Sequence, residues 1–283
     1  MAFLKPMSKK SLTNLAWHAK NSLIKKREKM EFLDSHAHLT GEGDYDNLDE
    51  IIKNAKNANV TKIVNICTDL GSLDRGLKLS KKYDFIYVAA ATTPHGADND
   101  KDVFFQDVKK AVEENKLIAV GETGLDYFYG FEKKEFQRLF FKNYLKLAKD
   151  NNLPLIIHAR DAFEDIFKIA DEIEHSKAVL HCFTGTQMDA KKVLDRGWYI
   201  SFSGIITFKN SESLREIVKT IPIESILIET DSPLLAPQSK RGKKNEPANI
   251  VETAKVIADI KNKSLDEIAK ITFENANKFL FIK

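Results

Sequence analysis

The sequence contains little cysteine, glycine or proline, and it has no long uncharged apolar run. Its two cysteines, Cys67 and Cys182, lie in apolar stretches instead of the dense pattern of a disulfide-stapled domain, and 283 residues can bury a core without crosslinks. Twelve Gly and seven Pro exclude collagen-like and low-complexity chains. No stretch approaches the roughly 20 apolar residues of a membrane-spanning helix. We therefore expect a soluble protein of a reducing compartment, the cytoplasm.

An excess of positive charge is also lacking outside the first 30 residues. The formal net charge is +3, but residues 1–30 carry eight Lys or Arg against the single acid Glu28, which leaves a net charge of −4 for the remainder. A protein that coats duplex DNA relies on many Lys and Arg, so the remainder does not fit such a protein. A nucleic-acid substrate must therefore be held locally.

The basic residues 1–30 are predicted to be an N-terminal extension that precedes a single domain, residues 31–283. The extension is rich in Lys and poor in acids. Such a segment could be an arm that binds nucleic acid, a helix on a membrane surface, or a transit peptide that directs the protein to an organelle. It could equally be an extension without function, and the sequence leaves these alternatives open.

Short apolar runs alternate eight times with longer amphipathic stretches in residues 31–283. Runs that are apolar almost throughout are typical of strands covered on both faces, as in a parallel sheet with helical crossovers. No dinucleotide-type glycine fingerprint follows the first run, which favours a closed barrel over an open doubly wound sheet. We expect an α/β fold, a (β/α)8 TIM barrel with extra C-terminal helices. The predicted strands are Phe32–Ala37, Lys62–Cys67, Phe85–Ala91, Leu117–Glu122, Pro154–His158, Ala178–Cys182, Trp198–Ser203 and Ile226–Thr230.

Between these runs, apolar residues recur at spacings of three and four, the period of an amphipathic helix. Two further helices follow the last strand, and we expect them to pack against the outside of the barrel. The clearest helical stretches are Tyr45–Ala58, Phe104–Glu114, Lys133–Asp150, Ala162–Glu174 and Leu214–Lys219, and the two tail helices are Ile250–Ile260 and Leu265–Phe281.

Six residues with metal-ligating side chains end predicted strands or follow them directly. One histidine at the end of an apolar run is more often a core residue, but six polar residues in one register point to a shared site. In a (β/α)8 barrel the C-terminal ends of the strands form the rim of the active site. The six residues are His36, His38, Glu122, His158, His181 and Asp231.

His36 and His38 are two residues apart, so in an extended chain both side chains face the same way and can bind one cation. By the same parity Cys182, the neighbour of His181, should face outward against a helix. Imidazoles and carboxylates without thiolate suit zinc, manganese or magnesium and exclude a cysteine-rich structural zinc site. Six ligands exceed one tetrahedral site, and two cations would bind a phosphoryl oxygen and generate a hydroxide that attacks phosphorus.

Six short segments combine these residues with their neighbours. They are Asp34-Ser35-His36-Ala37-His38-Leu39, Gly121-Glu122-Thr123-Gly124-Leu125-Asp126, His158-Ala159-Arg160, His181-Cys182-Phe183-Thr184-Gly185, Glu229-Thr230-Asp231-Ser232-Pro233 and Arg241-Gly242-Lys243-Lys244-Asn245-Glu246-Pro247. With these segments in this order, the chain from about Phe32 to Phe279 resembles the TatD deoxyribonucleases, within the wider group of amidohydrolase-like metal-dependent barrels. One segment alone would be a weak signal, but six in order are highly specific.

The resemblance implies a nuclease with two divalent metal ions, and it assigns the ligands. His36 and His38 would hold the first ion, and His158 and His181 the second. Glu122 would bridge the two ions.

The resemblance also implies that Asp231 binds metal and orients or deprotonates the attacking water, which makes it, with Glu122, a catalytic residue. Similar proteins remove nucleotides from DNA ends, often from single strands, with magnesium or manganese. The expected partner is therefore DNA, as single strands or frayed ends.

Two candidate substrate contacts lie near the predicted ligands. His95 stands in Thr93-Pro94-His95, where the family usually has His-Pro-His, so the first histidine is missing and His95 is either a substrate contact or a loop residue. Arg160, two residues after His158, shares its inward face, and its guanidinium can fork onto two phosphate oxygens. An ion pair of Arg160 with Glu164 or Asp165 is the alternative.

Two more groups of candidates lie in loops. Arg241, Lys243 and Asn245 follow the eighth strand, where barrels often bind phosphate, and a solvated surface loop is the alternative reading. Tyr127–Tyr129 follow Glu122 and could stack on the bases of a single strand, although a lid or packing role is as plausible.

The expected function is therefore divalent-metal-dependent hydrolysis of DNA phosphodiester bonds, by an exonuclease. The same barrel and ligands also serve hydrolases of carbon–nitrogen or ester bonds, and a barrel of this kind could bind nucleic acid without catalysis. A lysine after the fourth strand, which carbamylation would convert to a metal bridge, is absent because Glu122 stands there. This favours the phosphodiesterase.

Overall fold

The structure is a computed structural model that describes residues 30–41, 43–97 and 102–282. Glu31–Lys283 form one compact unit. The predicted basic extension, residues 1–30, lies outside the described residues except for Met30.

Eight parallel strands form one sheet in sequence order, as the eight apolar runs predict. Nearly all strand residues are buried, because helices cover the outer face of the sheet and the barrel interior is filled by side chains. The (β/α)8 barrel is confirmed. The strands are β1 (Phe32–Ala37), β2 (Val60–Cys67), β3 (Ile86–Ala90), β4 (Ala119–Asp126), β5 (Leu155–Arg160), β6 (Ala178–Leu180), β7 (Tyr199–Phe202) and β8 (Ile226–Ile228).

The segment after β8 joins the first and last strands at the C-terminal rim of the barrel. Ala37 and Ser232 form a parallel bridge. The amide of Asp231 donates to the carbonyl of His36 at 2.9 Å, and the amide of His38 donates to the carbonyl of Ser232 at 2.7 Å. The ring of strands therefore closes at three of the predicted metal ligands, His36, His38 and Asp231.

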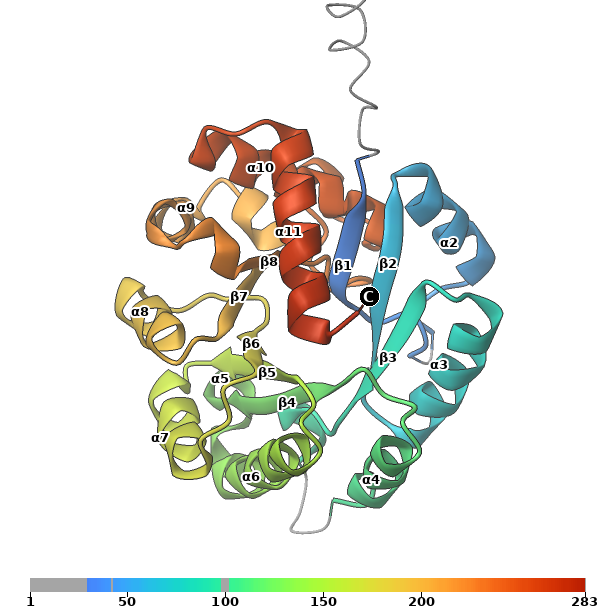
Figure 1. The fold of residues 1–283 in the computed structure, drawn as a ribbon, viewed down its shortest axis with the longest axis vertical. Helices are drawn as coiled ribbons and strands as arrows, with labels where there is room; N and C mark the ends of the chain where they lie inside the picture. Colours follow the sequence, from blue (N-terminus) through green and yellow to red (C-terminus); the bar gives the residue numbers. More distant parts are fainter. Residues whose placement is uncertain (1–29, 42, 98–101, 283) are drawn as a thin grey trace, which may run out of the picture. The chain divides into compact units, whose positions relative to one another are not determined.

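Helices surround the strand ring, as Figure 1 shows. Several begin at a side chain that accepts a hydrogen bond from the first turn, such as Asn47, Asp69 and Thr186. The helices of the ring are α2 (Leu48–Asn57), α3 (Leu70–Lys82), α4 (Phe105–Glu113), α6 (Lys134–Asp150), α7 (Phe163–Ile173), α8 (Gln187–Asp195) and α9 (Glu212–Thr220), and a short helix, α5 (Tyr127–Gly130), follows β4 directly.

The two tail helices, α10 (Ile250–Lys261) and α11 (Leu265–Leu280), occupy different positions. α10 packs beside α9 on the outside of the barrel, as we expected. α11 instead lies across the strand ring, where Phe279 and Leu280 join a buried cluster with Leu33 and Val179 near the strands' N-terminal ends. The tail therefore covers the mouth of the barrel opposite the one that carries the histidines.

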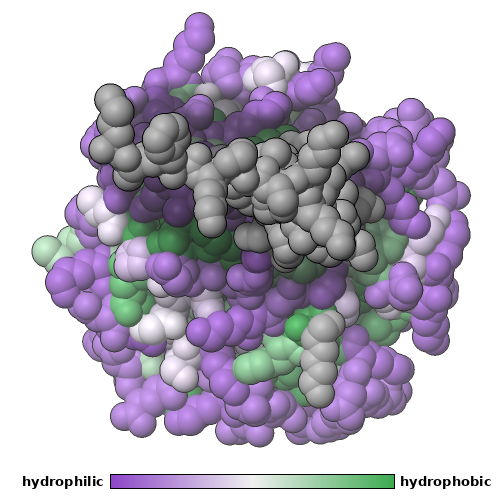
Figure 2. All heavy atoms as spheres, turned by 45° about the horizontal axis from the view of Figure 1, so that its top comes forward, coloured by the Kyte–Doolittle hydropathy of each residue, from purple (hydrophilic) through white to green (hydrophobic). Residues whose placement is uncertain are grey.

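Hydrophilic side chains cover most of the described surface in the view of Figure 2, with hydrophobic patches mainly in the recesses between them. Among the described residues, no helix combines the length and apolar character needed to cross a membrane.

Candidate metal centre

The first and last strands direct three ligand atoms to one place at the C-terminal rim. The side chain of His36 lies in the barrel interior. Its Nε2 is 3.2 Å from Nε2 of His38. Residues two apart in an extended segment share a side, which brings the two rings together. Oδ1 of Asp231 lies 3.5 Å from each of these nitrogens. The side chains of His36 and Asp231 are almost entirely buried.

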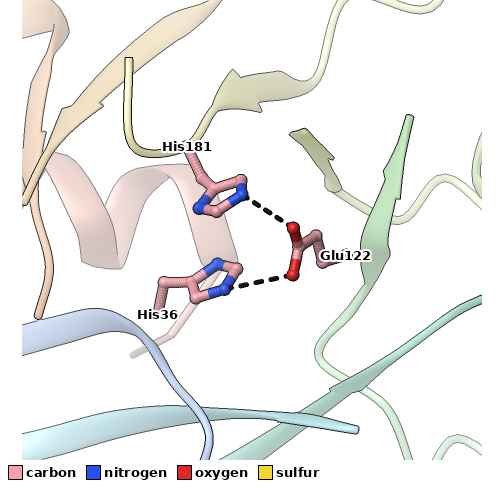
Figure 3. Close-up of side chains that lie close together, drawn as sticks. All are labelled: His36, Glu122 and His181. Carbon is pink, nitrogen blue, oxygen red and sulfur yellow. Dashed lines mark hydrogen bonds and ion pairs between the residues drawn. The ribbon is translucent and has the colours of Figure 1, made fainter. Parts of the chain in front are cut away.

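The carboxylate of Glu122, on β4, extends between two groups of histidines. Its Oε2 lies 3.5 Å from Nε2 of His36 and 3.7 Å from Nε2 of His38. Its Oε1 lies 2.7 Å from Nδ1 of His158 and 2.9 Å from Nε2 of His181. Figure 3 shows one oxygen directed at His36 and the other at His181. Each oxygen of Glu122 therefore faces a different pair of imidazoles.

The spacing of these atoms fits ligands arranged around cations. Four ligands about 2.1 Å from a zinc ion in a tetrahedron lie about 3.4 Å from one another. The ligand atoms of His36, His38 and Asp231 are 3.2 to 3.5 Å apart, and Nδ1 of His158 lies 3.2 Å from Nε2 of His181. His36, His38 and Asp231 form one group able to hold a metal ion, and His36, Glu122 and His181 form another.

Two further carboxylates face the outer ring nitrogens of the histidines. Asp126 Oδ2 lies 3.2 Å from Nε2 of His158, and Glu229 Oε1 lies 3.3 Å from Nδ1 of His181. Such contacts fix the ring orientation and tautomer of a metal-ligating histidine. Both acids stand inside the six segments, but sequence reasoning assigned them no role. The available signal is proximity in the sequence, because Asp126 follows Glu122 by four residues and Glu229 precedes Asp231 by two.

The electrostatics of the cluster keep its inner carboxylates ionised. Burial raises the pKa of Glu122, but His181, His158 and His36 outweigh it and hold that pKa well below its ordinary value. Burial likewise raises the pKa of Asp231, and its contacts with His38 and His36 reverse the direction, so the net shift is downward. The cluster therefore presents anionic oxygens to a cation at neutral pH.

β4 continues beyond Glu122, which we had expected to be its last residue. The strand runs to Asp126 and pairs Gly124 with His158 of β5. Gly124 has φ of +145°, and a Cβ there would lie 2.0 Å from the carbonyl oxygen of His158. In the sequence this glycine falls just after the predicted end of the strand at Glu122. In the structure it lies within β4 and allows β4 to approach β5 closely.

The prediction that Cys182 faces outward is wrong. β6 ends at Leu180, and Cys182 has φ of +44°, so the alternation of a strand does not extend to it. Its Sγ lies 3.2 Å from Oγ of Ser203. Burial, with the charges of Asp231 and Glu229, raises the pKa of this thiol well above 9.0. The thiol lies near the carboxylates in its protonated form.

His95 and Arg160 lie on the rim next to His158. Nε2 of His95 is 3.6 Å from Oδ2 of Asp126, and its side chain is 54% exposed. The guanidinium of Arg160 lies over the rings of Phe128 and Tyr129. Neither of the acids that we considered as partners of Arg160 pairs with it, since Asp165 instead binds Arg138 and the hydroxyl of Tyr127, and Glu164 forms no described ion pair.

The three candidates in the loop after β8 lie in different surroundings, and Lys243 is exposed. Arg241 is exposed, and its guanidinium lies 4.5 Å from the centre of the Phe208 ring. Asn245 is buried, its Nδ2 donates to the carbonyl of Thr230 at 2.8 Å, and its Oδ1 accepts from the amide of Glu246. Asn245 is expected from the sequence to contact the substrate. Because both atoms of its side-chain amide already bind the backbone, the geometry instead favours a role in holding the loop in place.

Sequence comparison finds relatives over nearly the whole compact unit. A profile of the family described as TatD related DNase matches residues 33–281. The chain is 40% identical over 251 residues to the uncharacterized metal-dependent hydrolase YabD of Bacillus subtilis, covering 88% of this chain and 98% of that protein. It is 36% identical over 259 residues to the uncharacterized metal-dependent hydrolase YcfH of Escherichia coli K12, covering 89% and 97%.

Solved structures show the same architecture. The TatD homolog YjjV of Escherichia coli K12 superposes with a TM-score of 0.84 at 27% identity, covering 90% of this chain and 99% of that one. A hydrolase TatD family protein of Entamoeba histolytica gives 0.79 at 25% identity, with the same coverage. The phosphotriesterase homology protein of Escherichia coli, at 11% identity and a TM-score of 0.66, shares the fold alone.

Proposed function

The chain belongs to the TatD related DNase family, and we propose that this metal-dependent hydrolase cleaves the phosphodiester bonds of DNA. We further propose that it acts as an exonuclease, on single strands or frayed ends. The compact unit carries a net negative charge of −4, with no excess of Lys and Arg to hold a duplex along its length, which supports a substrate gripped near the site.

The proposal rests on the positions of the two oxygens of the Glu122 carboxylate. Its two oxygens face different pairs of imidazoles, which supports two divalent cations that share Glu122. The six ligands fit magnesium, manganese or zinc. Two cations, when bound, neutralise the charge that develops on a phosphoryl group and lower the pKa of a water molecule.

The residues of the chain perform the remaining steps. Asp231 holds the attacking water and accepts its proton, because the lowered pKa keeps its carboxylate ionised at neutral pH. Arg160, half-buried at the rim and two residues from His158, binds a phosphate oxygen of the substrate. Arg241 contacts the DNA strand at the part of the rim that follows β8. His95 contacts the DNA strand near Asp126.

A cleavage assay tests the proposal. End-labelled single-stranded and duplex oligonucleotides are incubated with the protein and Mg²⁺, Mn²⁺ or Zn²⁺. We expect shortening of the single strand, and a kcat reduced by about 10²- to 10⁴-fold in Asp231→Asn, which keeps the side-chain shape but removes the base. Asp171→Asn, which removes only a surface ion pair with Arg196, should leave kcat unchanged.

Either of two results would contradict the proposal. If the wild-type protein cleaves no DNA with any of these metals but hydrolyses small amides or esters, the site is a carbon–nitrogen or ester hydrolase. If it binds DNA and metal without hydrolysing any of these substrates, the barrel is a binding protein.

A further inference from the structure

Three aromatic side chains are exposed in one short segment on the rim, directly after the strand that carries Glu122. Phe128 is 57% exposed, Tyr129 is 63% exposed and Phe131 is 58% exposed. Large aromatic rings are normally well buried. Three such rings within four residues therefore form an apolar surface at the mouth of the barrel.

Two of these rings are tied to the metal centre through one carboxylate. Oδ1 of Asp126 accepts hydrogen bonds from the backbone amides of Phe128 and Tyr129, each at 3.0 Å. The other oxygen of Asp126 contacts Nε2 of His158. The position of both residues is thereby fixed relative to a proposed metal ligand. The ring of His95 lies near both, 5.9 Å from the ring of Tyr129 and 6.0 Å from the ring of His158 between centres.

Arg160 completes this surface with a positive charge. Its guanidinium carbon lies 3.9 Å from the centre of the Phe128 ring and 4.7 Å from the centre of the Tyr129 ring. Among the described residues no carboxylate forms an ion pair with Arg160. The guanidinium is therefore held by stacking, and its hydrogen-bond donors are not taken up by a carboxylate of the described residues, so they can serve a ligand with negative charge.

We infer that Phe128 and Tyr129 form a stacking subsite for a nucleobase of single-stranded DNA next to the scissile phosphate. The inference rests on the proposed function and names how its substrate is held. Aromatic rings bind bases of any sequence through their faces, and Arg160 binds the phosphate that follows the stacked base. A base within a duplex is already stacked on its neighbours, so this subsite selects single strands and frayed ends.

Phe131 provides a matched control on the same segment. Its exposure equals that of Phe128 within one percentage point, but its ring contacts Tyr127 and the ammonium of Lys134 instead of Arg160. Its truncation therefore removes similar apolar surface without touching the proposed subsite.

The test compares two short single-stranded oligonucleotides, one of thymidine and one of 5,6-dihydrothymidine. The saturated ring of dihydrothymine keeps the hydrogen-bonding groups but is not planar, so it stacks poorly, while the phosphodiester is unchanged. For the wild-type protein with Mn²⁺ we expect kcat/KM to be about 5- to 100-fold higher for the thymidine strand, since stacking is the difference between the substrates.

The double variant Phe128→Ala, Tyr129→Ala should bring this ratio close to one, mainly by raising KM for the thymidine strand. Phe131→Ala should keep the wild-type ratio, and Tyr129→Phe, which retains the ring, should also keep it. A second double variant, Phe128→Leu, Tyr129→Leu, keeps apolar side chains beside Arg160 but has no aromatic face. Its ratio of kcat/KM values should therefore fall as in the alanine variant, although the packing is preserved.

The outcomes separate the two proposals. If the wild-type protein cleaves both strands equally, or if the double variants keep the wild-type ratio, the subsite is wrong and the nuclease stands. If the wild-type protein cleaves neither strand, the proposed function fails and the subsite fails with it. An equal loss of ratio in Phe131→Ala would show a general apolar surface and would also overturn the subsite.

Discussion

Oδ2 of Asp126 lies 3.2 Å from Nε2 of His158, on the side of the ring opposite the nitrogen that faces Glu122. The two ring nitrogens of His158 thus contact two carboxylates with different tasks. Glu122 lies within the ligand cluster, and Asp126, which is 1% exposed, holds the ring from behind.

Asp126→Asn should weaken metal binding without unfolding the protein. The amide can still cap α5, but it no longer supplies the negative charge that orients His158 and raises its basicity. We expect the affinity for Mn²⁺ to fall by about 10- to 100-fold, measured by calorimetric titration of the metal-free protein.

Asp165→Asn is the matched control for this prediction. Asp165 lies near the same segment and contacts Tyr127 and Arg138, but it touches no ligand histidine. Its metal affinity should equal that of the wild type. Equal losses in the two variants, or none in Asp126→Asn, would show that Asp126 does not orient His158.

Metal binding should release protons and weaken on acidification. Burial lowers the pKa of His181, but Glu122 and Glu229 outweigh it and raise that pKa well above 6.5. The pKa of His158 is raised in the same way, by Asp126 and Glu122 against burial. In the metal-free protein these rings therefore bind an additional proton more tightly than a free imidazole does, and a cation must compete with that proton.

The sign follows from this competition. As the pH falls below the raised pKa values, more protons compete and the apparent affinity decreases; as the pH rises through them, the affinity increases and levels off. Titrations with Mn²⁺ in two buffers of different ionisation enthalpy give the number of protons released. An affinity independent of pH, with no proton release, would contradict the assignment of these histidines as ligands.

Gly124→Ala should destabilise the barrel by at least about 3 kcal/mol, because both the backbone conformation and the contact with β5 resist a methyl group. The added Cβ would lie 2.0 Å from the carbonyl oxygen of His158 at φ of +145°. Gly197→Ala is the control: its φ is +71°, but no atom lies within 4 Å of the added Cβ, so the cost should be about 1 kcal/mol. Urea unfolding measures both, and equal values would refute the close approach of β4 and β5.

The sequence predicts the order of the strands and the rim at which the six predicted metal ligands meet, because both depend on local periodicity. Apolar runs mark the strands, and β1 has the predicted bounds, Phe32–Ala37. A closed parallel barrel brings all C-terminal strand ends to one rim, so residues distant in sequence, such as His36 and Asp231, meet without further information.

The rest depends on contacts between segments that periodicity does not describe. The predicted end of β4, at Glu122, is wrong because position 124 must be a glycine to fit against the backbone of β5, and this contact is not visible in the sequence of β4 alone. The orientation of Cys182 depends on one left-handed residue after β6. α11 covers the barrel mouth, although its amphipathic pattern resembles that of a helix on the outside.

In our proposal Glu122 would serve two cations that together support cleavage of DNA. The most direct test of this shared role is a titration of the metal-free protein with Mn²⁺ in which bound metal and cleavage of a single-stranded oligonucleotide are measured at each step. We predict that two equivalents bind and that cleavage rises with the second. Full activity after one equivalent, or no cleavage with both sites filled, would contradict a shared role of Glu122 in DNA cleavage.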